Sequence, residues 1–265
     1  MEKLVKLNQK LLNKMNIVNE GFEGILYLSK CKKKVYKVFR PERYLSFNNE
    51  LKSLKKLKKE KHIINYLNYR DDTFKIIEYQ YYHYGDVYLF CKNNKSRQIK
   101  KICLKNELTL NKLWTAIKNC HDNGVCHRDI KIDNLLIDYN YNKKQKEIIL
   151  NDFGLSCQRI DNISGSCGTY NYIAPEIYKY KFSDIKYNYK VDIWSAGITW
   201  LRASVVNVNV EFNYNNIKLF GINEIKKNYS HIWNKMTPLT QFILENSLQV
   251  KPENRLDANK FVELF

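Results

Sequence analysis

The sequence predicts an α+β protein in two lobes, with strands at the front of the chain and helices at the back. Short β-branched and aromatic runs separated by turns fill the first third. After Asn93 and Asn94 the apolar residues take the spacing of amphipathic helices. We therefore expect a small strand-rich lobe over about residues 1–93, with one helix, and a larger helical lobe over about 94–265.

The first lobe is expected to hold a hairpin, a helix and further strands. Gly24–Leu28 and Lys34–Phe39 are β-branched and aromatic runs split by a Lys-rich turn, which predicts the hairpin. From Ser46 to Lys61, leucines recur at three-residue intervals amid charges, as in a helix with one buried stripe. Strand-like sequence returns from Phe74 to Cys91.

The second lobe is expected to be mainly helical. Leu108 to Asn123 is amphipathic, and a second helical stretch opens near Asp192. Tyr139 to Glu147 is rich in Lys and Asn, which predicts a solvated loop between two strands. Because no internal repeat or low-complexity linker separates further units, we interpret residues 1–265 as one domain.

Composition excludes several classes of protein. Hydrophobic residues make up 44% of the 265, which is enough to form a core, so the chain is not expected to be disordered. The seven cysteines show no C-x-x-C pairing, which argues against a zinc site or a disulfide scaffold. The N-terminus lacks the apolar core of a signal peptide, and no apolar run reaches the roughly 18 residues of a membrane span. An intracellular, reducing compartment, cytoplasm or nucleus, is expected.

The net charge of +18 leaves two interpretations open. Six lysines between Lys52 and Lys61 would suit contact with a nucleic acid, another anionic surface or an acidic partner. Alternatively, they form a solvated face in a sequence that is rich in Lys, Asn, Ile and Tyr throughout. We favour the second interpretation, and the first could coexist with another activity.

The densest chemical signal lies between His127 and Asn134. Asp129 is followed by Lys131 two residues on and by Asn134 five residues on. This set offers a carboxylate to orient a hydroxyl, a cation for a phosphoryl group and an amide oxygen for a hard metal ion. Eighteen residues after Asn134, Asp152-Phe153-Gly154 adds a second carboxylate suited to magnesium, with a glycine that permits a turn.

These two motifs resemble the H-R-D-x-K-x-x-N and D-F-G signatures of the eukaryotic protein kinase family. The resemblance implies the bilobal kinase fold, with a regulatory helix in the N-terminal lobe. Lys37, in Val35-Tyr36-Lys37, is similar to the strand lysine that holds the α- and β-phosphates of ATP. Glu50 is its expected helical partner, because Glu42 lies next to Pro41 before the helix begins.

Three further segments are similar to the family. Residues 168–176 resemble the peptide-positioning loop and the A-P-E motif, and Asp192 resembles the aspartate that braces the catalytic loop. Arg255 matches the arginine that pairs with the A-P-E glutamate, here Glu176. His127 is expected to pack against Phe153 rather than to transfer a proton.

The phosphate-binding loop departs from the family pattern. Asn19 stands at the first glycine position of G-x-G-x-x-G-x-V, followed by Gly21, Gly24 and Leu26. Asn tolerates left-handed backbone, so the turn could survive. The tip reads Phe22-Glu23, and an acid beside a triphosphate would repel it unless Glu23 points outward and Phe22 caps the site.

The resemblance implies a serine/threonine kinase that uses ATP and Mg²⁺ on protein substrates. Asp129 would orient the acceptor hydroxyl, and Lys131 would stabilise the γ-phosphoryl group. Asn134 and Asp152 would bind magnesium. The implied nucleotide-binding residues are Lys37, Glu50, Gly21, Gly24, Leu26, Val35 and Leu136, with Phe90 lining the site at the end of a strand.

Specificity and control are also implied in part. Lys131 with Thr169 is the serine/threonine mark of the family, and Leu155 resembles kinases that prefer serine. The 167–176 segment resembles the polo-like and calmodulin-dependent branches, and the subfamily stays open. Arg128 suggests control by an anion from the activation segment, with Ser164 and Ser166 as candidate phosphorylation sites. Asp133 would suit a basic substrate, whereas the charge of +18 favours an acidic one.

A pseudokinase is the competing interpretation. The altered glycine-rich loop favours a scaffold that regulates a partner without phosphoryl transfer. The presence of Lys37, Asp129, Asn134 and Asp152 together favours catalysis.

Overall fold

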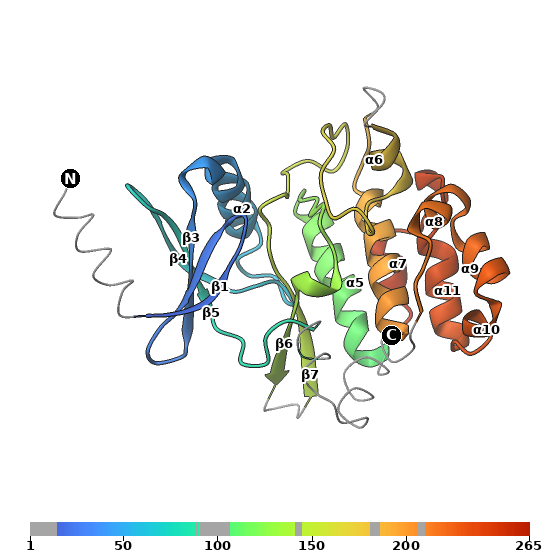
Figure 1. Ribbon diagram of the computed structural model, residues 1–265, viewed down its shortest axis with the longest axis horizontal. Coiled ribbons are helices and arrows are strands. Elements are labelled where there is room, and N and C mark those ends of the chain that lie inside the picture. The colour runs from blue at the N-terminus through green and yellow to red at the C-terminus, as the bar shows by residue number, and fades with distance from the viewer. Residues whose placement is uncertain (1–14, 88–89, 91–106, 141–144, 181–185, 206–209) are drawn as a thin grey trace.

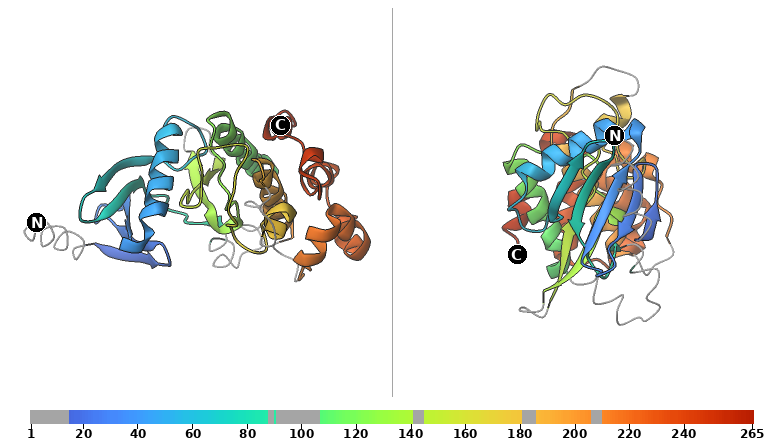
Figure 2. Two further views of the ribbon diagram at one scale, coloured as in Figure 1. Left: turned by 90° about the horizontal axis from the view of Figure 1, so that it is seen from above. Right: turned by 90° about the vertical axis from the view of Figure 1, so that its left-hand side faces the viewer.

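The computed structural model describes residues 15–87, 90, 107–140, 145–180, 186–205 and 210–265 (Figure 1). An antiparallel five-stranded sheet with one long helix against it lies at one end of the molecule, and the helices α7 to α11 lie at the other (Figures 1 and 2). The short β6–β7 sheet lies between them. This is the predicted α+β architecture of two lobes.

The elements of the first part are five strands, a 3-10 turn and a helix. The sheet has the order β1-β2-β3-β5-β4. Its elements are β1 (Asn16–Glu20), β2 (Gly24–Leu28), β3 (Lys34–Phe39), η1 (Pro41–Arg43), α2 (Tyr44–Lys56), β4 (Tyr66–Asp71) and β5 (Lys75–Gln80).

The second part is mainly helical. Its elements are α5 (Glu107–Asp122), η2 (Ile132–Asn134), β6 (Leu135–Asn140), β7 (Gln145–Leu150), α6 (Pro175–Tyr180), α7 (Lys190–Ser204), α8 (Tyr214–Phe220), α9 (Ile222–Asn228), α10 (Ser230–Trp233), α11 (Pro238–Ser247), η3 (Pro252–Asn254) and α12 (Ala258–Val262).

The predicted hairpin and helix of the first lobe are confirmed, but the helix is shorter than expected. Strands β2 and β3 pair with Leu26 opposite Lys37. Helix α2 buries Phe47, Leu51 and Leu54 and ends at Lys56, whereas the leucine spacing predicted a helix to Lys61. The chain leaves the helix at Leu57, which is buried at the C-cap, and then makes a turn in which the Glu60 amide bonds to the Leu57 carbonyl.

The strand predicted from Phe74 to Cys91 is mostly wrong. Strand β5 ends at Gln80, and a turn with Gly85 at φ +67° follows, since glycine adopts a left-handed backbone without steric cost. Phe90 therefore lies well beyond the strand, in helical backbone, and its ring packs edge-on against Tyr84. Cys91 and the predicted lobe boundary near residue 93 fall outside the described residues.

The loop predicted between Tyr139 and Glu147 is shorter than expected. Strand pairing continues outward, with Tyr139 opposite Lys146 and Asn140 opposite Gln145, so only residues 141–144 lie outside β6 and β7. The Lys- and Asn-rich composition predicted a loop, but backbone pairing extends into this range from both sides. Polar composition alone did not locate the strand ends.

The helical lobe follows the predictions closely. Helix α5 spans nearly the predicted range, and α7 opens two residues before Asp192. Gly197 allows α7 to lie against α11, because a β-carbon there would stand 2.3 Å from the Ser247 hydroxyl. The Trp114 ring stacks on Phe261 at 4.0 Å between centroids, which ties α5 to the C-terminal helix α12.

The expected pair of Arg255 and Glu176 is confirmed. Two guanidinium nitrogens donate to the two carboxylate oxygens at 2.6 and 2.8 Å, and Arg255 is almost fully buried. The same guanidinium also donates to the carbonyls of Gln249, Lys190 and Val250. The pair therefore fixes the A-P-E segment to the start of α7 and to the chain that precedes η3.

In the described ranges, no helix combines the length and apolar character needed to cross a bilayer. The six lysines of the 52–61 stretch are all exposed on and just after α2. Lys55 and Lys58 lie over the rings of Tyr69 and Tyr66. This arrangement fits the interpretation of a solvated face, and contact with an anionic partner stays a prediction.

Glu176→Gln should lower the free energy of unfolding by about 3–5 kcal/mol, because it leaves the buried Arg255 charge without its carboxylate. Urea unfolding followed by circular dichroism would measure the change. The matched control is Glu263→Gln, which breaks an exposed Lys260–Glu263 pair and should cost less than about 1 kcal/mol. Equal losses for the two variants would contradict the buried role of Arg255.

Candidate active site

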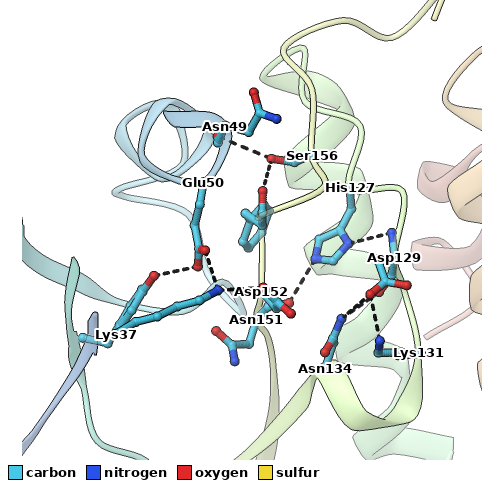
Figure 3. Close-up of polar contacts among 12 residues, drawn as sticks. Lys37, Asn49, Glu50, His127, Asp129, Lys131, Asn134, Asn151, Asp152 and Ser156 are labelled. Carbon is cyan, nitrogen blue, oxygen red and sulfur yellow. Dashed lines mark hydrogen bonds and ion pairs between the residues drawn. The ribbon is translucent and has the colours of Figure 1, made fainter. Parts of the chain in front are cut away.

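Lys37 on β3 joins two carboxylates that come from different elements. Its ammonium nitrogen lies 2.8 Å from Glu50 Oε2 on α2 and 3.0 Å from Asp152 Oδ1 in the Asp-Phe-Gly segment (Figure 3). Glu50 is 1% exposed, whereas Asp152 is partly open to solvent. Glu50, and not Glu42, is the partner of Lys37, as the spacing along the helix predicted.

Burial and charge oppose each other in this cluster. Burial would lower the pKa of Lys37, but the carboxylates of Asp152 and Glu50 outweigh it and hold that pKa above its ordinary value. Burial raises the pKa of Glu50 despite the nearby ammonium group. The pKa of Asp152 is lowered, because Lys37 outweighs the effect of burial. Lys37 is therefore held as a cation facing the ionised Asp152.

Tyr79 is a positioning residue that sequence reasoning missed. It lies on β5, and its hydroxyl donates a 2.6 Å hydrogen bond to Glu50 Oε1. Burial raises the pKa of Tyr79 well above its ordinary value, so it remains a donor. The strand pattern could have placed this side chain on the inner face of the sheet, but not at a particular carboxylate.

Asp129 is held by donors from both the catalytic loop and the peptide-positioning loop. Oδ1 accepts from the amide and hydroxyl of Thr169 at 2.9 and 2.8 Å. Oδ2 accepts from Lys131 at 2.8 Å and from the Asn134 amide at 3.2 Å (Figure 3). The Lys131 ammonium also donates to the Thr169 hydroxyl at 2.8 Å. The residues predicted from the H-R-D motif therefore converge on one carboxylate.

Asp192 holds the backbone that precedes Asp129, as expected. Its fully buried carboxylate accepts from the amides of His127 and Arg128, both at 2.8 Å. Burial would raise the pKa of Asp192, but His121 and the other partners lower it. Arg128 has φ +68°, a backbone conformation that is unfavourable for a residue other than glycine. The two hydrogen bonds from the backbone amides to Asp192 offset that cost. His121 is a further residue that the sequence analysis missed.

His127 packs as predicted. Its ring meets Phe153 edge-on with centroids 4.6 Å apart, and Nε2 lies 3.0 Å from the Asn151 carbonyl. The left-handed residue of this segment is Asp152, at φ +63°, and Gly154 is not in that conformation. Gly154 is needed for space instead, because a β-carbon there would stand 2.4 Å from the Ser46 hydroxyl on α2.

The donor set fits magnesium. Asp152 offers a partly exposed carboxylate with a lowered pKa, and hard divalent cations prefer such oxygens. The Asn134 amide nitrogen makes both of its bonds to Asp129, which leaves the amide oxygen as the atom available to a metal. Among the described residues, no group of three or more His, Cys, Asp or Glu side chains forms a metal site by itself.

The glycine-rich loop keeps its turn without a left-handed asparagine. Asn19 lies in extended β1 opposite Leu26, and the Gly21 amide bonds to the Gly24 carbonyl at 3.0 Å. A β-carbon on Gly24 would lie 2.1 Å from the Val38 carbonyl, so close pairing with β3 requires glycine. Gly21 has open space around it.

Glu23 points inward. The Phe22 ring is 72% exposed and lies 3.3 Å below the Arg43 guanidinium carbon, so it does not cap the site. Glu23 Oε2 is buried and makes no hydrogen bond within the described part of the chain. It lies 3.8 Å from the point where a β-carbon on Gly154 would stand, and Asp152 Oδ1 lies 3.5 Å from that point. The outward orientation that would spare a triphosphate is not the one observed.

Val35 and Leu136, the expected adenine contacts, are both half-buried. Val35 pairs with Leu28 and Tyr79, and Leu136 forms a bridge to Asp86 in the segment after β5. Their position against a nucleotide stays a prediction.

Polar contacts connect α2 to the activation segment. Ser53 and Ser156 hydroxyls lie 2.7 Å apart, and the Gln158 amide donates to Ser53 at 2.9 Å. Arg128 donates to the Leu155 carbonyl at 2.7 Å and reaches the Ser164 carbonyl at 3.5 Å. Ser164 and Ser166 are exposed, so both are accessible to a modifying enzyme, and their phosphorylation stays a prediction.

Tyr79→Phe should lower the free energy of unfolding by about 1–3 kcal/mol, since it leaves Glu50 Oε1 buried without its donor. Thermal and urea unfolding would measure the loss. The matched control, Tyr69→Phe on the exposed edge strand β4, should change stability by less than about 0.5 kcal/mol. If the two variants unfold alike, Tyr79 does not hold Glu50.

Comparisons with known proteins agree with this geometry. Serine/threonine-protein kinase CG17528 of Drosophila melanogaster and serine/threonine-protein kinase GL21140 of Drosophila persimilis are 37% and 35% identical over 94 residues, 36% of this chain and 12% of each relative. CBL-interacting protein kinase 21 of Oryza sativa subsp. japonica is 33% identical over 177 residues, 62% of this chain and 31% of the relative. Each match covers less than a third of the relative's own length.

The family described as the protein kinase domain matches residues 26–264, nearly the whole chain; of the glycine-rich loop, only Leu26 falls within the match. The Lys37–Glu50 ion pair between the sheet and α2 is the contact expected of that fold. This chain belongs to the protein kinase domain family.

Proposed function

We propose that this chain is a serine/threonine kinase that transfers the γ-phosphoryl group of ATP to hydroxyls of protein substrates. The observation that supports the proposal best is the convergence of two groups in one site: Lys37 with Glu50 and Asp152, and Asp129 with Lys131, Asn134 and Thr169. Each group supplies a part that phosphoryl transfer requires, and both lie in the same part of the molecule (Figure 3).

In this proposal, each side chain has one role. Lys37 holds the α- and β-phosphates, and Glu50 and Tyr79 fix its position. Asp129 orients the acceptor hydroxyl and takes its proton late in the reaction, while Lys131 lies beside it to stabilise the transferring group. Asp152 and the Asn134 amide oxygen would hold magnesium, which would neutralise phosphate charge.

Specificity for serine and threonine is supported by Thr169. Its hydroxyl bonds to both Asp129 and Lys131, so the peptide-positioning loop is attached to the catalytic carboxylate. The names of the Drosophila relatives include serine/threonine-protein kinase. A preference for serine, from Leu155, remains the finer expectation.

A pseudokinase scaffold is the second candidate, and Glu23 favours it. Its carboxylate, whose Oε2 is buried beside Gly154, would repel a triphosphate, because like charges at short range cost energy in a partly buried site. The complete set of Lys37, Asp129, Asn134 and Asp152 favours catalysis. The two candidates therefore differ in whether ATP enters and reacts.

Asp129→Asn should lower phosphate transfer from labelled ATP with magnesium to a generic basic protein by roughly a hundred- to ten-thousand-fold, since the amide cannot accept the hydroxyl proton. The control is Asp161→Asn, an exposed residue of the activation segment that touches none of the site residues named above. Equal transfer by Asp129→Asn and wild type would contradict the catalytic assignment. If neither the wild type nor Asp129→Asn transfers phosphate and the wild type does not bind ATP, the result would favour the pseudokinase scaffold.

Glu23→Gln should bind MgATP about tenfold more tightly than wild type, a change of ~1.4 kcal/mol, because it removes a carboxylate from the phosphate site. Calorimetric titration would measure the dissociation constants. Glu42→Gln removes the same charge from the nearby exposed 3-10 turn and should leave affinity unchanged. If both variants bind as wild type does, Glu23 does not oppose the nucleotide.

A further inference from the structure

Two cysteines lie opposite each other beside the active site. Cys126 directly precedes His127-Arg128-Asp129, and Cys157 follows Asp152-Phe153-Gly154 by three residues. The two residues form an isolated antiparallel bridge, with each amide donating to the other's carbonyl at 2.9 Å. Such hydrogen-bonded pairs have α-carbons about 5.5 Å apart, which lies within the range that a disulfide bond spans.

The environments of the two thiols differ. Cys126 is fully buried, and burial raises its pKa well above the ordinary value. Cys157 is half-buried, and a hydrogen-bonding interaction with the Cys126 thiol, together with the Arg128 guanidinium, lowers the pKa of Cys157 to about 7. Near neutral pH, Cys157 is therefore partly a thiolate beside a cation, and Cys126 holds its proton.

We propose that Cys126 and Cys157 form an oxidative modification site, in which a hydroperoxide converts the pair into a disulfide bond between the catalytic loop and the start of the activation segment. The site does not depend on the proposed kinase activity, because its formation requires only the two thiols and the oxidant. Cys157 is the residue that the oxidant meets first, and Cys126 resolves the intermediate.

The chemistry balances in two steps. The Cys157 thiolate attacks one oxygen of hydrogen peroxide, so that an S–O bond forms, the O–O bond breaks and hydroxide leaves. The Cys126 sulfur then attacks the Cys157 sulfenic acid; the S–S bond forms, the S–O bond breaks, and the departing hydroxide with the Cys126 thiol proton gives water. Two sulfur atoms are oxidised and one peroxide molecule is reduced.

Cys167 is the competing partner. Its thiol lies near Arg128 and interacts electrostatically with Cys157, but burial raises its pKa. It lacks the reciprocal backbone pairing that sets Cys126 opposite Cys157. Cys120 is fully buried, and Cys31 is exposed in the turn between β2 and β3, far along the chain from both loops. Among the cysteines that the structure describes, the backbone register therefore selects Cys126.

Peptide mapping of the full chain would test the site without reference to activity. The protein is treated with hydrogen peroxide, free thiols are alkylated, and the digest is analysed by mass spectrometry with and without dithiothreitol. A Cys126–Cys157 cross-linked peptide that disappears on reduction is expected. The Cys31→Ser background removes a thiol that is exposed in the described part of the chain and could link two molecules. Cys167→Ala should leave the cross-link in place.

Two variants separate the roles of the thiols. Cys126→Ala should leave Cys157 as a sulfenic acid that dimedone traps, with several-fold more adduct than in wild type. Cys157→Ala should abolish both the cross-link and the adduct at this site. A Cys157–Cys167 cross-link, or no Cys126–Cys157 cross-link in wild-type protein whose Cys31 is fully oxidised, would overturn the proposal. Circular dichroism of each variant would show that the fold is retained.

Discussion

Lys37 lies between two carboxylates, and the geometry of this side of the site depends on the three side chains together. Glu50 belongs to α2, Lys37 to the sheet and Asp152 to the segment after β7. The desolvation penalty of buried charges is about as large as the free energy gained from their attraction, so such a cluster adds little to stability. Its value lies in geometry: the three elements must approach each other for the ammonium group to be satisfied at all.

The second constraint is the buried Asp192 carboxylate. Arg128 adopts a left-handed backbone conformation that its side chain disfavours. The two hydrogen bonds that backbone amides donate to Asp192 make that conformation the stable one. Asp129 then faces Thr169 and Lys131 because the chain has turned just before it. A helix that is itself almost completely buried therefore sets the direction of an active-site carboxylate.

Periodicity and motif spacing predicted the two-lobed fold, the β2–β3 hairpin, the partner of Lys37 and the pairing of Arg255 with Glu176. Strand ends were predicted poorly, because the turn at Gly85 interrupts a run whose aromatic residues look like a strand. In Asp-Phe-Gly, the residue with left-handed backbone is the aspartate. The glycine is required because Ser46, on a helix distant in sequence, leaves no space for a side chain, and no local sequence pattern predicts this contact. The inward orientation of Glu23 and the donor Tyr79 also depend on tertiary packing.

The contacts of Ser53 and Asn49 with the activation segment have a mechanical consequence. Ser156 and Gln158 bond to Ser53 on α2, and Gln158 also bonds to the Asn49 carbonyl, one residue before Glu50. A displacement of residues 156–158 would pull on the same helical turn that carries the partner of Lys37. The activation segment and the Lys37–Glu50 ion pair therefore depend on the same turn of α2, so a shift of either one would be transmitted to the other.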